Sequence, residues 1–232
     1  MGEELAEWCK NSLGVKLNEQ YGQTECDLVI GFCSEVMKIV QGSIGKAVPG
    51  HVVEIINEKG EVVKPGELGE IAVKCPDPVM FLGYWKNQKA TKERFTGDWM
   101  RTGDYGTKDE DGYFRFTGRE DDIIESGGFR IGPGEIEDCL MKHEAMSLVG
   151  VIGVPDKIRG EIIKAFIVPK EGVKVDKALE ESIKDHVKTK LEAHAYPREI
   201  EFMQEMPRTK SGKILRSELR KLHMEKAGKE GE

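Results

Sequence analysis

Four short clusters of tyrosine, acidic, basic and glycine residues are the parts of this sequence that could carry chemistry. They occupy residues 21–25, 101–104, 118–137 and 207–213. Carboxylates suit a hard cation such as Mg²⁺, or the hydroxyls of a sugar. Lysine and arginine offset negative charge that gathers on carboxylate and phosphate oxygens. These residue types would therefore suit a reaction in which several negative oxygens meet.

Each cluster by itself also has an ordinary structural interpretation. Residues 21–25 could form a turn with a solvated Glu25, Asp104 could be a turn former, and Arg119 could belong to a surface ion pair. Residues 207–213 lie in a basic stretch, and runs of charge are usually solvated. The residues alone leave both interpretations open.

The stretch around the second cluster predicts a small, mainly antiparallel β unit. Short β-prone runs alternate with turns over residues 43–118. We expect strands at residues 52–56, 61–63, 70–73, 99–101 and 113–117. Residues 5–17, ahead of this unit, have a weakly helical pattern of apolar positions.

After Arg119 the pattern becomes that of a compact α+β domain. Pro133 suits the first position of a helix and is followed by acidic residues in the first turn. Asp176 is the expected N-cap of a second helix that is apolar along one side. Strands are expected at residues 121–124, 149–154, 162–168 and 200–203, with a turn at 126–128. The predicted fold class is therefore α+β.

Composition narrows the functional classes. The chain has 232 residues and a net charge of −7, which gives no reason to expect nucleic-acid binding. No stretch approaches the roughly 20 apolar residues of a membrane span, and the N-terminus does not resemble a signal peptide, so no membrane partner is expected. The 5 cysteines form no CxxC pair, which argues against a disulfide framework and a structural zinc site. A cytoplasmic location is the expectation.

The four clusters, in this order and spacing, resemble the adenylate-forming superfamily of acyl-CoA synthetases, peptide-synthetase adenylation domains and luciferases. The resemblance covers nearly the whole chain, and the third cluster is long enough to be specific by itself. Residues 151–168 and 196–202 look most like medium-chain acyl-CoA synthetases, followed by short-chain or branched-chain enzymes. The resemblance implies ATP-dependent activation of a short- or medium-chain fatty acid to acyl-AMP, followed by transfer to coenzyme A and release of AMP.

The resemblance implies a nucleotide site. Tyr21 would stack on adenine, Thr24 would bond the α-phosphate, and Glu25 would hold the Mg²⁺ ion that bridges the phosphates. Asp104 would accept hydrogen bonds from both ribose hydroxyls, and Arg119 would hold the ribose and phosphate side. The implied nucleotide-binding set is Tyr21, Gly22, Gln23, Thr24, Asp104, Arg119 and Lys213; the catalytic set is Thr24, Glu25 and Lys213; the metal ligand is Glu25.

The resemblance assigns separate parts of the chain to the two chemical steps. In the first step Lys213, on a flexible Ser211–Gly212 loop, would approach the carboxylate and the α-phosphate together. The C-terminal domain would then rotate about a hinge at Asp121. The turn formed by Gly127 and Gly128 would leave a passage for the pantetheine arm of coenzyme A, and Arg159 would meet a phosphate of that cofactor.

One expected motif is missing. Superfamily members carry a phosphate loop rich in serine, threonine and glycine, with a lysine, upstream of the first cluster. The most similar glycine- and lysine-containing string in this chain, residues 42–47, does not match that loop. We therefore expect the chain to be the C-terminal half of such an enzyme, inactive alone, with the N-terminal half as a possible separate partner. The expected domains are an incomplete large domain at 1–119, a mobile C-terminal domain at 120–224 and a disordered tail at 225–232.

Two alternatives stay open. The activated acid could pass to a carrier-protein thiol or enter a luciferase-type oxidation in place of transfer to coenzyme A. The chain could also be a non-catalytic adenylate-binding or interaction remnant of a truncated gene. The segments that resemble medium-chain enzymes argue against the first alternative, and the retained residues Glu25, Asp104, Arg119 and Lys213 argue against long neutral decay.

Overall fold

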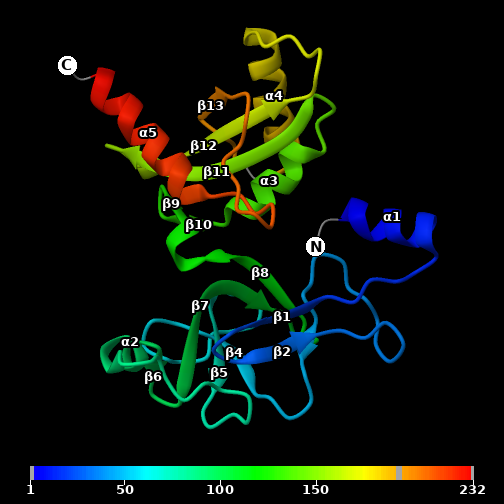
Figure 1. The fold of residues 1–232 in the computed structure, drawn as a ribbon, viewed down its shortest axis with the longest axis vertical. Coiled ribbons are helices and arrows are strands. Elements are labelled where there is room, and N and C mark those ends of the chain that lie inside the picture. Colours follow the sequence, from blue (N-terminus) through cyan, green and yellow to red (C-terminus); the bar gives the residue numbers. More distant parts are fainter. Residues whose placement is uncertain (1–2, 192–194, 231–232) are drawn as a thin grey trace. The chain divides into compact units, whose positions relative to one another are not determined.

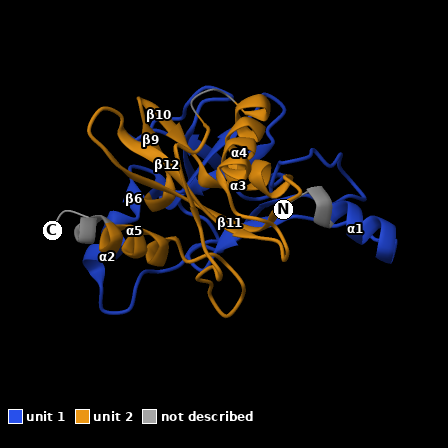
Figure 2. Cartoon of the chain, turned by 90° about the horizontal axis from the view of Figure 1, so that it is seen from above, with its two compact units in different colours: residues 1–120 blue, residues 121–232 orange. Residues whose placement is uncertain are grey.

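The chain divides into two compact units in a computed structural model, unit 1 at Met1–Glu120 and unit 2 at Asp121–Glu232 (Figures 1 and 2). The structure describes residues 3–191 and 195–230. Each unit has a hydrophobic core of its own and is built mainly on antiparallel strands. The predicted α+β class is confirmed.

Unit 1 contains two small sheets. Its elements are α1 (Glu3–Leu13), β1 (Gln20–Gln23), β2 (Asp27–Gly31), β3 (Lys46–Ala47), β4 (Val53–Ile56), β5 (Gly69–Lys74), α2 (Gln88–Glu93), β6 (Phe95–Thr96), β7 (Trp99–Lys108) and β8 (Phe114–Arg119). One sheet has the order β1-β2-β3, and the other has the order β4-β5-β7-β6 with β8 paired to β7. Their shared core includes Val29, Ile55, Ile71 and Phe114.

The predicted strands of unit 1 are largely present, with two differences. Residues 61–63 do not form a strand: Val62 makes only an isolated bridge to Ile56. The strand expected at 99–101 continues without interruption to Lys108. Its pairing with β5 is irregular between Arg101 and Tyr105, where Gly103 has a φ of +74°. This continuation brings Asp104 opposite Arg119 in the ladder between β7 and β8.

The described residues of unit 2 form a five-stranded sheet with three α-helices. A 3₁₀ turn, η1 (Glu120–Asp122), leads into it, so the strand expected at 121–124 begins only at Ile124. The elements that follow are β9 (Ile124–Ser126), β10 (Phe129–Ile131), α3 (Pro133–Met141), β11 (Met146–Asp156), β12 (Gly160–Pro169), α4 (Lys177–Lys190), β13 (Glu199–Phe202) and α5 (Arg216–Glu230). The order is β10-β9-β12-β11, with β13 parallel to β12.

Alternating residues of β11 serve two separate cores. Val149 and Val151 pack into the cluster that includes residues of α3 and α4. Ile152 and Val154 pack into the cluster that includes Leu219 of α5. Because successive side chains of a strand point to opposite faces, the sheet is covered on both sides. The helices begin where the sequence predicts, with Pro133 in the first turn of α3 and Asp176 accepting a bond from the amide of Leu179.

Helix α5 is longer than the sequence suggests. Residues 225–230, assigned from the sequence to a disordered tail, belong to this helix, and residues 231–232 lie outside the described part. Within the described residues, no helix combines the length and the apolar character needed to cross a membrane.

Candidate functional site

The first cluster of the sequence lies on the β1–β2 hairpin. Thr24 and Glu25 occupy its turn, Thr24 is exposed, and Glu25 is half-buried. The hairpin is closed tightly at Gly22: an added Cβ would lie 1.5 Å from the carbonyl oxygen of Asp27. Glycine is therefore required here by the approach of two backbones.

Side chains of three predicted nucleotide residues converge on the carboxylate of Asp104. The Tyr21 hydroxyl donates to Asp104 Oδ2 over 2.7 Å, and Gln23 Nε2 lies 3.4 Å from the same oxygen. Arg119 Nε lies 3.3 Å from Asp104 Oδ1. The Asp104 side chain is 8% exposed, whereas Arg119 is 50% exposed. The structure thus brings together residues separated by about eighty positions along the chain.

Tyr21 lies in a strongly perturbing environment. Burial, and then the neighbouring charge of Asp104, raise the pKa of the Tyr21 phenol far above its ordinary value. The phenol therefore stays protonated and acts as a donor to Asp104. The ring of Phe116 lies 6.4 Å from the Tyr21 ring, and Phe116 is 45% exposed. An aromatic surface therefore borders the carboxylate.

Glu25 accepts from Tyr84, a partner that the sequence reasoning missed, and Arg94 supports Tyr84 in turn. The Tyr84 hydroxyl donates to Glu25 Oε1 over 2.6 Å, and Arg94 Nε donates to the same hydroxyl over 3.0 Å. Burial, and then the bond to Glu25, raise the pKa of Tyr84. No sequence signal predicts that Tyr84 contacts Glu25, because 59 positions separate the two residues.

A carbonyl group joins the surroundings of Glu25 to those of Asp104. The carbonyl oxygen of Thr102 accepts from Gln23 Nε2 over 3.1 Å and from Arg94 Nη1 over 3.2 Å. The adjacent segment of β7 is held by the buried Glu70, which accepts from the amide of Gly103 over 2.7 Å and from Arg101 over 2.6 Å. The carboxylate of Asp104 is therefore presented by a fully supported backbone segment.

Lys213 lies on a tight hairpin in unit 2. The hairpin is closed by a bridge between Arg208 and Ile214, and the amide of Thr209 donates to the carbonyl of Lys213 over 2.8 Å. Gly212 has a φ of +88°, which favours glycine. Lys213 itself is exposed. The expected loop is thus a hydrogen-bonded turn that presents the lysine to solvent.

The residues predicted for the second step also lie on turns of unit 2. Gly127 and Gly128 join β9 to β10 with φ values of +59° and +86°. The amide of Gly127 donates to the carbonyl of Arg159 over 2.9 Å, so the structure brings Arg159 beside the glycine turn. Asp121 lies in η1, at the boundary between the two units. The roles given to these residues remain predictions.

The donors around Glu25 are of a kind that fits Mg²⁺. Among the residues that the structure describes, no group of three or more His, Cys, Asp and Glu side chains could hold a metal ion. One carboxylate beside an exposed threonine hydroxyl is nevertheless sufficient, because Mg²⁺ is commonly held by one or two carboxylates together with substrate phosphates. Glu25 could therefore hold an ion that arrives with a nucleotide.

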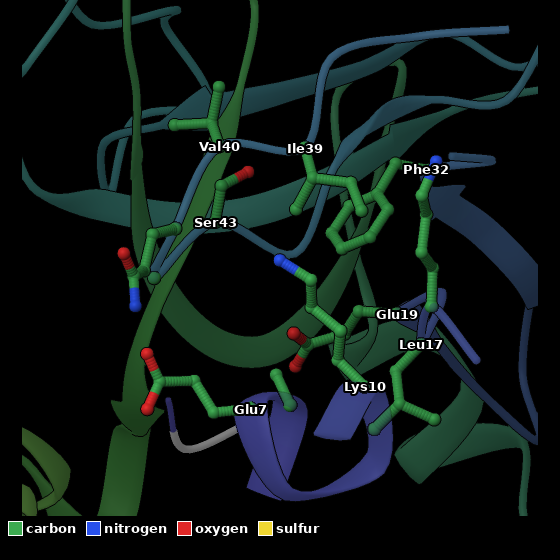
Figure 3. A pocket seen from close by; sticks show the side chains of 12 residues that line it. Glu7, Lys10, Leu17, Glu19, Phe32, Ile39, Val40 and Ser43 are labelled. Atoms are coloured by element: carbon green, nitrogen blue, oxygen red, sulfur yellow. The ribbon is translucent and has the colours of Figure 1, made fainter. Parts of the chain in front are cut away.

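Two hollows lie outside the convergence on Asp104. A cavity of about 270 Å³ in unit 1 is bordered by α1, which supplies Glu7 and Lys10, and by Phe32 and Ile39 (Figure 3). It contains none of the predicted site residues. In unit 2, a broad hollow of about 800 Å³ lies beside the lysine hairpin, with Arg208 and Lys210 in its lining.

Two family models match the chain. The model of the AMP-binding enzymes matches residues 1–85, and the model of the AMP-binding enzyme C-terminal domain matches residues 135–213. The chain belongs to the AMP-binding enzymes. The second match covers the helices and strands from α3 to the lysine hairpin of this family member.

Curated relatives of this family member are acyl-CoA ligases. An uncharacterized acyl-CoA ligase of Bacillus subtilis, YtcI, is 45% identical over 221 residues, which are 95% of this chain and 42% of that protein. The mitochondrial acyl-coenzyme A synthetase ACSM3 of Rattus norvegicus is 44% identical over 223 residues, which are 94% of this chain and 38% of that protein. The chain thus spans about two fifths of the length of these relatives.

Solved structures of adenylate-forming enzymes have the same fold. The anthranilate CoA ligase AuaEII, in complex with anthranoyl-AMP, has a TM-score of 0.83 and 36% identity over 94% of this chain and 42% of that one. ATP-bound MatB from Rhodopseudomonas palustris has a TM-score of 0.85 and 30% identity over 95% of this chain and 43% of that one.

Proposed function

We propose that this chain contributes the C-terminal part of an AMP-forming acyl-CoA synthetase. In this function a carboxylic acid is joined to the α-phosphate of ATP as acyl-AMP, pyrophosphate leaves, and the acyl group passes to the thiol of coenzyme A with release of AMP. The observation that carries the proposal is the convergence of Tyr21, Gln23 and Arg119 on Asp104. The names of the relatives support it.

In the proposed first step, unit 1 binds the nucleotide. Asp104 accepts hydrogen bonds from the ribose, Tyr21 and Phe116 border the adenine, and Arg119 neutralises charge on the phosphate side. Thr24 donates to the α-phosphate. When bound, Mg²⁺ offsets phosphate charge, and Glu25 supplies its carboxylate ligand. Lys213 donates to the carboxylate and α-phosphate oxygens as they approach, since a lysine ammonium offsets their mutual repulsion.

In the proposed second step, unit 2 turns about Asp121 and presents the Gly127–Gly128 turn to the acyl-AMP. An added Cβ on Gly128 would have no atom within 4 Å, so this turn leaves open space beside its backbone. A bulky Gly128→Phe variant should therefore slow thioester formation and spare adenylation. Gly128→Ala is the matched control, because it shares the strain of a positive φ but adds little bulk.

The acid that we propose is a short- or medium-chain fatty acid. The support is the similarity to several acyl-coenzyme A synthetases from mammals and to a 4-hydroxybutyrate–CoA ligase of Metallosphaera sedula, which is 40% identical over 232 residues. A different acceptor remains an alternative for the second step. The similar structures include an amide bond synthetase from Marinactinospora thermotolerans, at 29% identity, so the fold also occurs in an enzyme that is not named as a coenzyme A ligase.

The test is ATP–pyrophosphate exchange with a panel of straight-chain acids. It should be run on this chain alone and on the chain mixed with a segment that corresponds to the rest of a relative such as YtcI, because the chain spans 42% of that protein. We expect exchange only in the mixture. Exchange by the chain alone would contradict the need for additional residues. A mixture that binds ATP and acids but never exchanges would favour a non-catalytic adenylate-binding remnant.

A further inference from the structure

Two arginines of α5 hold the segment that leads into unit 2. Arg220 Nη2 donates to the carbonyl oxygen of Asp121 over 2.7 Å and to Asp122 Oδ1 over 2.8 Å. Arg216 Nη1 donates to Asp122 Oδ2 over 3.2 Å. The Asp122 side chain is only 13% exposed, so this is a partly desolvated ion cluster and not a solvent-exposed pair. We call these four residues the arginine clamp.

The arginine clamp is tied to the core of unit 2. Arg216 Nη2 donates to Glu137 Oε2 over 2.6 Å, and the other oxygen of Glu137 accepts from the amide of Val151 over 2.8 Å. Burial raises the pKa of Glu137, and the positive charge of Arg216 opposes that rise. The arginine clamp is therefore linked to α3 and β11 through the carboxylate of Glu137, whose charged form is stabilised by Arg216.

The helix that supplies the clamp also carries the lysine hairpin. The amide of Leu215 donates to the carbonyl of Pro207 over 2.9 Å, and α5 begins at the next residue, Arg216. The helix packs closely on β11, because an added Cβ on Gly150 would lie 2.8 Å from Leu219 Cδ1. Lys213 and the clamp are thus parts of one closely packed body.

The residue before Asp121 is held by the other unit. Arg101 of β7 donates to Glu120 Oε1 over 3.4 Å, and Glu120 is the last residue of unit 1. The carbonyl of Asp121 is bonded to α5 of unit 2. The Glu120 contact is long and its side chain is 57% exposed, so it restrains the chain less than the bond to the Asp121 carbonyl does. The backbone torsions just before that carbonyl are therefore the ones that can absorb a rotation without breaking the bonds to α5.

We propose that Arg216 and Arg220 are positioning residues that fix the chain entry of unit 2 to the helix carrying Lys213, so that the units pivot at Asp121 and the lysine moves with its unit as one rigid arm. The proposal rests on the proposed function, since it concerns the delivery of Lys213. It gives a physical reason for a pivot at Asp121 in place of Asp122, whose carboxylate both arginines hold.

The test is hydrogen exchange of the 232-residue chain, followed on a peptide covering residues 120–126. Arg220→Gln should speed exchange there by about tenfold, because it removes charged hydrogen bonds that close this segment. Peptides from β11 and β12 should keep their rates. Lys221→Ala is the matched control: it lies next on α5, is exposed and pairs only with Glu218 among the interactions described. Arg220→Lys, which retains a charged donor, should give an intermediate rate.

The outcomes separate this inference from the proposed function. Unchanged exchange at 120–126 in a folded Arg220→Gln variant would overturn the clamp. If that variant does not fold, Asp122→Asn weakens the same contacts more mildly and should accelerate the same peptide; no acceleration would again overturn the clamp. In the mixture of this chain with the remaining segment of a relative, Arg220→Gln should change the ratio of the rate of pyrophosphate exchange to the rate of thioester formation, whereas Lys221→Ala should not. Absence of any exchange reaction would count against the proposed function and leave the hydrogen-exchange result standing.

Discussion

The candidate site residues of the two units differ in how they are held. In unit 1, Asp104 and Glu25 already have hydrogen-bonding partners on other elements, namely Tyr21 and Tyr84. In unit 2, Lys213 is exposed at the end of a hairpin, and Gly127 and Gly128 form a bare turn. The proposed nucleotide-binding residues of unit 1 are therefore held by other side chains before any ligand binds. The residues of unit 2 that are proposed to act one after the other, in the first and the second step, lie on exposed turns.

This contrast suits the proposed division of labour. A nucleotide site benefits from preorganised partners, because less ordering is required when the ligand binds. Residues that must enter and leave a site cannot be buried in it. What keeps such projecting turns accurate is the support beneath them, which in unit 2 is the arginine clamp and the packing of α5 on β11.

The largest stability effect should come from that support. Arg216→Met should cost unit 2 about 3 kcal/mol at pH 7, because it leaves the buried carboxylate of Glu137 without its positively charged partner. The measure is the unfolding free energy from native-state hydrogen exchange of amides in β11 and β12. Since burial raises the pKa of Glu137, the variant should recover part of the loss as the pH falls and the carboxylate takes up a proton. A loss that is independent of pH would show that the support does not depend on this pair.

A smaller effect is expected from loosening the partners in unit 1. Tyr84→Phe removes the hydroxyl between Glu25 and Arg94 and should cost about 1 kcal/mol. All 3 tryptophans lie in unit 1, so their fluorescence follows the unfolding of this unit alone. Combining Tyr84→Phe with Glu25→Gln should give less than the sum of the single effects, since both act on one bond. Strict additivity would mean that Glu25 is not held in advance by Tyr84.

The partnership of Tyr21 with Asp104 can be tested at high pH. A raised phenol pKa means that the folded state favours the protonated form, so its contribution to stability is present below about pH 10 and is lost as the pH rises further. Asp104→Asn removes the second cause of the raised pKa and should lower it, but not to the ordinary value, because burial is the larger cause. The pH dependence of the unfolding free energy of unit 1 between pH 8 and 11, followed by tryptophan fluorescence, should be shallower in Tyr21→Phe than in the wild type. An equal dependence in the two proteins would contradict the raised pKa of Tyr21.

The smallest effect is expected at His143, which follows α3 and contacts Ser182 and His186 of α4. Burial, and then the neighbouring His186, lower the pKa of His143, whose Nδ1 accepts from the amide of Ala145. The neutral ring is therefore favoured in the folded state, and stability should fall as the pH drops below about 6.5. Unfolding of His143→Gln, followed by exchange of the α3 amides between pH 5 and 7, should show a shallower pH dependence than the wild type. An equal pH dependence in the two proteins would show that another group, and not His143, causes the loss of stability.

The sequence predicted local features better than distant ones. The Gly127–Gly128 turn and the start of α3 at Pro133 depend on backbone preferences of single residues, so they could be anticipated. The strand expected at 61–63 was wrong, because the pairing of this segment with β4 is limited to an isolated bridge between Val62 and Ile56. The partners of Glu25 could not be foreseen, since Tyr84 meets it only after the fold has formed.

The most direct test of the account is to measure both half-reactions for Lys213→Ala in the active mixture. Lys210→Ala, on the same exposed hairpin, is the matched control. We expect Lys213→Ala to reduce ATP–pyrophosphate exchange by roughly 10²–10³-fold, as for the loss of one transition-state donor. Thioester formation from supplied acyl-AMP should largely survive, and Lys210→Ala should leave both reactions near their original rates. An equal loss of both half-reactions in Lys213→Ala would contradict the view that unit 2 presents different turns to a nucleotide site prepared in unit 1.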